Sequence, residues 1–97
     1  MNLTDSLKKF KIMLQKLPDN PINAFEFYSF FKSLPMVDSE SIPFIELGTI
    51  LKHKKPSIFF ELRKQFSHNK VIHIVTTVDM DLNEAETTIA KMIDSKK

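Results

Sequence analysis

Basic and aromatic side chains gather in one stretch of this chain, LKHKKPSIFFELRKQFSHNK at residues 51–70. Residues 52–70 hold six Lys/Arg residues and one acid, whereas residues 34–51 hold three acids and no Lys/Arg. Each contact between a Lys or Arg and a phosphate releases a counterion, which favours nucleic-acid binding. A basic segment beside acidic ones is therefore a candidate nucleic-acid surface.

Two adjacent phenylalanines in this stretch take different places on a helical wheel. Phe59 joins the inward, apolar stripe, whereas Phe60 falls on the opposite side beside Arg63 and Lys64. An exposed aromatic ring among cations costs solubility, so an exposed Phe60 indicates a contact surface. The alternative is that another helix of the same domain covers Phe60. The inward stripe consists of Ile58, Phe59, Leu62 and Phe66.

The wider segment FIELGTILKHKKPSIFFELRKQF resembles a helix-turn-helix. Its first helix carries the small residue Gly48 and the apolar Leu51, and Ile58 follows seven residues after Leu51. The segment departs from the motif at two positions, because Lys52 replaces the usual turn glycine and Glu61 occupies an expected apolar position. The second helix of such a motif enters the major groove by its N-terminal residues, and the first crosses the backbone.

The resemblance implies roles for individual residues of this segment. Lys54, Lys55 and Ser57 would meet phosphate, while Phe60, Arg63 and Lys64 would face the groove. The predicted binding residues, for nucleic acid or another partner, are Lys52, Lys54, Lys55, Ser57, Phe60, Arg63, Lys64 and Lys70.

Other chemistry finds little support in the sequence. The single glycine, Gly48, is the only one of the chain, so the glycine-rich loops that bind phosphates in P-loop and dinucleotide-binding proteins are excluded. The three histidines lack the spacing of a zinc site, and the chain has no cysteine. Acids between Asp79 and Glu86 suit the start of a helix, where the helix dipole is positive. We therefore expect no metal, no cofactor and no enzymatic activity.

Length and composition predict a single domain spanning residues 1–97. Its residues are 42% hydrophobic, and its net charge is only +2, so any basic partner site must depend on local charge. No apolar run approaches the ~20 residues that cross a bilayer, and the N-terminus lacks the apolar core of a signal peptide. We expect a cytoplasmic protein with no membrane partner.

Apolar periodicity predicts a mainly α (α+β) fold, a compact bundle of about five helices with one β-strand. Phenylalanines cover most of the circumference of the second helix, which indicates either a central helix or one that also meets another chain. Ser39 or Ser41 would cap the third helix. The predicted helices cover residues 6–17, 22–34, 42–52, 56–66 and 82–93, and the strand precedes the last of them.

The strand prediction comes from VIHIVTTV, residues 71–78, in which seven of the eight residues are β-branched. A lone strand leaves its backbone groups unpaired. The segment would therefore pair with its own copy in a homodimer, fold back as a short hairpin, or form a buried helix instead.

Two functions fit these patterns. The first is a small, dimeric DNA-binding regulator or accessory factor that uses the helix-turn-helix-like segment to bind duplex DNA. The second is a protein-binding module, such as an inhibitor, immunity protein or adaptor, whose aromatic and basic surface binds an acidic protein partner.

Overall fold

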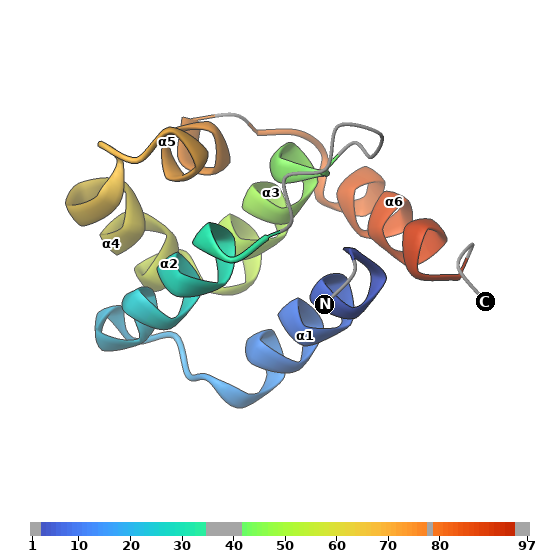
Figure 1. Ribbon diagram of the computed structural model, residues 1–97, viewed down its shortest axis with the longest axis horizontal. Helices are drawn as coiled ribbons and strands as arrows, with labels where there is room; N and C mark the ends of the chain where they lie inside the picture. Colours follow the sequence, from blue (N-terminus) through green and yellow to red (C-terminus); the bar gives the residue numbers. More distant parts are fainter. Residues whose placement is uncertain (1–2, 35–41, 78, 95–97) are drawn as a thin grey trace.

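The computed structural model describes residues 3–34, 42–77 and 79–94, which form six α-helices and one short 3-10 helix (Figure 1). The mainly helical, compact fold that the sequence predicts is confirmed. The elements are α1 (Leu3–Lys16), η1 (Pro21–Asn23), α2 (Ala24–Lys32), α3 (Phe44–Lys54), α4 (Pro56–Phe66), α5 (Lys70–Thr77) and α6 (Leu82–Asp94).

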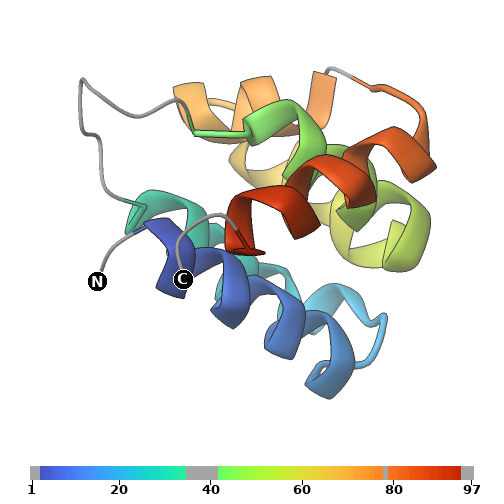
Figure 2. The same cartoon turned by 90° about the vertical axis from the view of Figure 1, so that its right-hand side faces the viewer.

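Helix α3 is the centre of the arrangement, because it contacts α4, α5 and α6. In Figure 1, α4 lies to the left of α3 and α6 to its right. Figure 2 shows α1 and α2 together along the opposite side of the molecule from α5. The last helices therefore surround α3, and the first two cover the remaining side of the core.

An aromatic cluster joins α1 to α2. The buried ring of Phe10 on α1 lies 6.1 Å from the ring of Phe27, 5.6 Å from that of Phe30 and 6.2 Å from that of Phe31, between centroids. Rings at these separations attract one another beyond the effect of burial alone. Most of the phenylalanines of the second predicted helix thus serve the core.

Helix α5 crosses α3 at Gly48, where the two backbones come unusually close. A Cβ atom at position 48 would lie 2.9 Å from the carbonyl carbon of Val75 and 3.2 Å from its Cα atom. One residue further on, the buried Thr49 hydroxyl donates to the Ile45 carbonyl at 2.8 Å and accepts from the Met80 N–H at 3.1 Å. Gly48 and Thr49 together fix α5 and the linker that follows it onto α3.

The predicted strand at residues 71–78 is wrong: residues 70–77 form helix α5, and the described residues contain no strand. The side chains of Ile72, Val75 and Thr76 are buried at the i, i+3, i+4 spacing of a helix. Burial of one such apolar side chain is worth roughly 1.5–3 kcal/mol, which outweighs the few tenths of a kcal/mol that a β-branched residue costs a helix. The Thr76 hydroxyl donates to the Ile72 carbonyl at 2.7 Å, so it is satisfied within the helix.

This correction also affects the expected homodimer. The homodimer is expected only because a lone strand would need a second strand to pair its backbone groups. A helix pairs these groups within itself, so α5 removes this reason for a dimer. The oligomeric state of the chain stays a prediction. Val78, the last residue of the predicted strand, lies outside the described residues.

Polar side chains cap the last two helices. Asn69 accepts from the Val71 N–H at 2.9 Å at the start of α5, and Asp81 accepts from the Glu84 N–H at 3.0 Å at the start of α6. The predicted caps Ser39 and Ser41 lie outside the described residues, and α3 begins directly after Pro43. In the parts of the chain that the structure describes, we find no helix whose length and apolar character would let it span a bilayer.

Candidate partner-binding surface

The predicted binding residues do not form one patch. Lys52 lies toward the end of α5, whereas Lys54 and Lys55 line a groove between α1 and α6. Phe60 and Lys64 occupy the outer side of α4. Arg63 of α4 lines the same hollow as Lys52, so the basic segment divides into a surface on α4 that reaches Lys52 and a separate groove lined by Lys54 and Lys55.

Lys52 is paired within the molecule. Its ammonium group lies 3.1 Å from a carboxylate oxygen of Asp79 and 5.9 Å from the ring centroid of Phe59. The hydrogen bond from Lys52 lowers the pKa of Asp79 below its ordinary value of 3.8, although partial burial opposes the shift. Lys52 therefore fastens the linker after α5 to α3, and a partner anion would have to compete with Asp79 for it.

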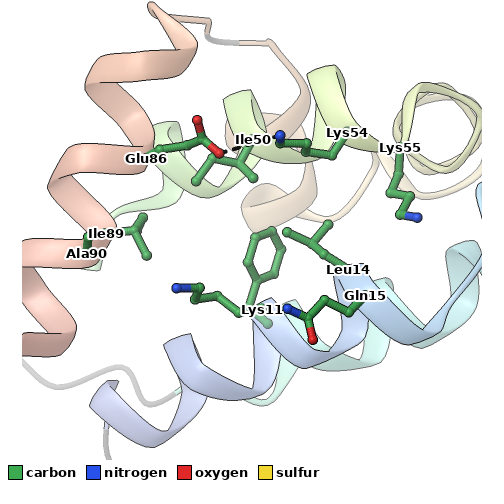
Figure 3. Close-up of a pocket in the computed structure, with 10 residues that line it drawn as sticks. Lys11, Leu14, Gln15, Ile50, Lys54, Lys55, Glu86, Ile89 and Ala90 are labelled. Carbon is green, nitrogen blue, oxygen red and sulfur yellow. Dashed lines mark ion pairs between the residues drawn. The ribbon is translucent and has the colours of Figure 1, made fainter.

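Lys54 and Lys55 turn away from α4. The Lys54 ammonium lies 3.6 Å from a carboxylate oxygen of Glu86 on α6, and both lysines line the groove between α1, α3 and α6 (Figure 3). A single residue, Lys55, separates α3 from α4. The phosphate contacts that the helix-turn-helix resemblance implies for these two lysines would thus lie beside α1 and not along the outer side of α4.

A carboxylate already occupies the N-terminus of α4. The Asp19 side chain accepts a hydrogen bond from the backbone N–H of Ile58 at 3.1 Å, 39 residues away in sequence, and so replaces a local cap. Ser57, one residue before, is exposed. Because a phosphate at this helix end would have to approach Asp19, the arrangement disfavours anion binding here.

Phe60 is 51% exposed, whereas its neighbour Phe59 is buried. The predicted burial of Phe59 is confirmed and Phe60 is exposed, but the two rings touch edge to face and so do not lie on opposite sides of the helix. Arg63 and Lys64 are also exposed, and neither forms an ion pair with any residue that the structure describes. We refer to Phe60, Arg63 and Lys64 as the α4 face.

Two further exposed apolar residues lie on elements that contact α4. Ile22 on η1 is 80% exposed and Phe25 at the start of α2 is 58% exposed; both η1 and α2 pack on α4. The ring centroid of Phe25 lies 6.4 Å from that of Phe66, and the Tyr28 ring stacks on Phe66 at 4.2 Å. We refer to Ile22 and Phe25 as the apolar flank.

Ile22 and Phe25 are not among the predicted binding residues, although the aromatic residues from Phe25 to Phe31 are one reason for the protein-binding hypothesis. The signal for Phe25 was present, because phenylalanines surround that helix and the core can cover only one side. No signal identified Ile22, which follows a turn proline. Lys70, the remaining predicted residue, is exposed at the first position of α5.

Metal chemistry has no support in the described part of the chain, where no three His, Cys, Asp or Glu residues are grouped to hold an ion. Neither a family model, nor a curated protein, nor a solved structure matches the chain. The surfaces themselves must therefore carry any functional conclusion.

Proposed function

We propose that this protein is a protein-binding module that docks an acidic protein partner on the α4 face and its apolar flank. One observation carries the proposal. Ile22, Phe25 and Phe60 are the three most exposed large apolar side chains of the described residues, and all three lie on α4 or on elements packed against it. An inhibitor, an immunity protein or an adaptor would act in this way.

The composition of this surface is that of a protein interface. Aromatic and Arg side chains supply most of the binding energy at protein interfaces, and the α4 face combines Phe60 with Arg63. The two rings are also held in place: Phe60 lies 5.2 Å from the buried Phe59 in an edge-to-face contact, and Phe25 lies against Tyr28 and Phe66. Rings that are already ordered lose little conformational entropy on binding.

The charge of the surface indicates the kind of partner. Arg63 and Lys64 are not neutralised by an ion pair in the described chain, while the one acid of α4, Glu61, is only half exposed. Complementary charge speeds encounter and selects among partners more than it adds affinity. The proposed partner therefore presents an apolar patch bordered by acidic side chains.

Duplex-DNA binding is a second candidate function, favoured by the two helices at the predicted positions and by the exposed Arg63 and Lys64. It would require α4 to enter the groove despite the Asp19 carboxylate at its N-terminus. Two of the predicted binding lysines, Lys52 and Lys54, would also have to leave their acidic partners. Because of these requirements, we favour protein binding over DNA binding.

The test is affinity capture from nuclease-treated extract of the source cells, with the Phe60→Ala variant in parallel. We expect one protein to be retained stoichiometrically by the wild type and lost with Phe60→Ala, because loss of a central aromatic anchor costs about 2 kcal/mol or roughly thirtyfold in affinity. Light scattering on the purified pair then gives the stoichiometry. The control is Ile12→Ala, since Ile12 is 49% exposed but lies on α1.

A fluorescence-anisotropy titration with labelled duplex DNA decides between the two functions. Binding that weakens steeply between about 50 and 200 mM salt, and that the double variant Arg63→Glu/Lys64→Glu abolishes, would establish the DNA-binding function instead. A partner retained equally by wild type and Phe60→Ala would refute docking on the α4 face.

A further inference from the structure

A groove that does not include the α4 face lies between α1, α3 and α6 (Figure 3). Its volume is about 390 Å3, within the range of roughly 300–1,000 Å3 that small-molecule sites occupy. Its floor is apolar and belongs largely to the buried core of the protein. The floor consists of Phe10, Leu14, Ile50 and Ile89.

The rim of this groove is basic. Lys11, Lys54 and Lys55 line it together with a single acid, Glu86, and that acid is paired with Lys54 at 3.6 Å. Lys11 and Lys55 form no ion pair with any residue in the described ranges. The groove therefore keeps two positive charges without a counter-charge above an apolar floor.

The two lysines that lack an ion pair in the described ranges lie at different ends of the groove. Lys11 extends from α1 along the space between α1 and α6, and Lys55 lies at the other end of the groove (Figure 3). A ligand resting on the floor would thus have a cation beside it at either end. Gln15 also lines the groove and supplies both a donor and an acceptor.

From this juxtaposition we infer that the groove binds a small amphipathic anion, with the apolar body on the floor and the anionic group paired with Lys11. A medium-chain carboxylate and an aromatic sulfonate share this chemistry. The pairing is favourable because a charge-assisted hydrogen bond beside an apolar surface is stronger than one in open water. The groove does not include the α4 face, so this inference and the proposed function succeed or fail separately.

The test uses two probes, 1-anilinonaphthalene-8-sulfonate and dodecanoate, on the full chain. We expect saturable fluorescence enhancement with the sulfonate, and displacement of the sulfonate by dodecanoate below the concentration at which dodecanoate forms micelles. In a two-dimensional NMR titration, we expect the amide shifts to concentrate at residues of the groove, such as Gln15 and Ala90. Shifts concentrated on α4, or failure of dodecanoate to displace the sulfonate, would overturn the inference.

Variants locate the site further. Lys11→Glu should weaken binding of the sulfonate by roughly tenfold or more, because it replaces an attraction with a repulsion. Ala90→Trp should abolish binding by filling the groove from an exposed position on α6. The matched control is Lys16→Glu, which makes the same charge change on the other flank of α1 and should bind as the wild type does.

Glu86→Gln should raise the affinity for the sulfonate, whereas Lys11→Glu and Ala90→Trp should lower it. Among the described residues it removes the only acid that lines the groove, and it frees Lys54, so the affinity for the sulfonate should rise several-fold. Circular dichroism shows whether each variant is folded. Unchanged affinity in both folded Lys11→Glu and folded Glu86→Gln would refute the assignment, even if the sulfonate binds elsewhere on the protein.

Discussion

Replacement of Gly48 by alanine tests the close crossing of α3 and α5. Gly48 has no positive φ, so its role is not conformational freedom. What matters is the missing Cβ: an added methyl would lie 2.9 Å from the Val75 carbonyl carbon and 3.2 Å from its Cα atom, with the carbonyl oxygen nearer still. Ordinary carbon contacts lie at about 3.5–4.0 Å. The variant therefore requires α5 to move away from α3.

The magnitude follows from two opposed terms. Overpacking of a well-packed interior costs about 1–3 kcal/mol, and the upper end applies here because the obstacle is backbone, which has no alternative rotamer. Movement of α5 would also disturb the fully buried side chains of Ile72 and Val75. Alanine in a helix interior gains about 1 kcal/mol over glycine. The free energy of unfolding should therefore fall by about 2 kcal/mol, a large part of the ~5–15 kcal/mol usual for a domain.

Urea unfolding followed by circular dichroism measures this loss. For a chain of this size the midpoint should fall by about 1–2 M while the slope of the transition stays constant. The control is Ser29→Ala on the exposed side of α2, which should stay within about 0.5 kcal/mol of the wild type. A Gly48→Ala variant as stable as the wild type, or stabilised by the helix-propensity gain, would refute the close crossing.

The Asp19 cap and the Lys52–Asp79 ion pair give two further predictions. Asp19→Ala should lower the free energy of unfolding by about 0.5–2 kcal/mol, because the Ile58 N–H at the start of α4 loses its acceptor. Asp19→Asn keeps an acceptor and should lower it much less. Equal losses of the two variants in urea unfolding would contradict the capping role. The pKa of Asp79 is lowered by its hydrogen bond with Lys52, so the stability that this pair adds is present above pH ~4 and is lost as pH falls through the lowered value. Both side chains are more than one third exposed, so the difference in the free energy of unfolding between wild type and Asp79→Asn should be below about 1 kcal/mol at pH 7. The difference should shrink as pH falls below ~4 and through the lowered pKa of Asp79. A difference that does not change on acidification would show that the pair is not its source.

The helix at residues 56–66 could be predicted from the sequence, and that at 44–54 was predicted two residues too early, at 42–52, because apolar periodicity and prolines are local signals. The inward position of Phe59 followed from the same periodicity. The candidate site could not be predicted as a unit, because a helical wheel gives the direction of a side chain but not what stands opposite. Lys52 and Lys54 are two residues apart, yet they meet acids on different elements, Asp79 before α6 and Glu86 within it.

Helix α5 shows where local signals fail. Its β-branched residues favour a strand by propensity. The close approach of α5 to α3 at Gly48 lets one helical stripe be buried, and the free energy of that burial exceeds the strand preference. By itself, the sequence determined a mainly helical fold and the inward stripes, whereas the exposure of Phe60 came only from the tertiary structure. The tertiary structure decided the conformation of residues 70–77, the partners of the lysines and the association of Ile22 and Phe25 with α4. The physical reason is that periodicity is encoded within a few residues, whereas burial and charge pairing depend on residues distant in the chain.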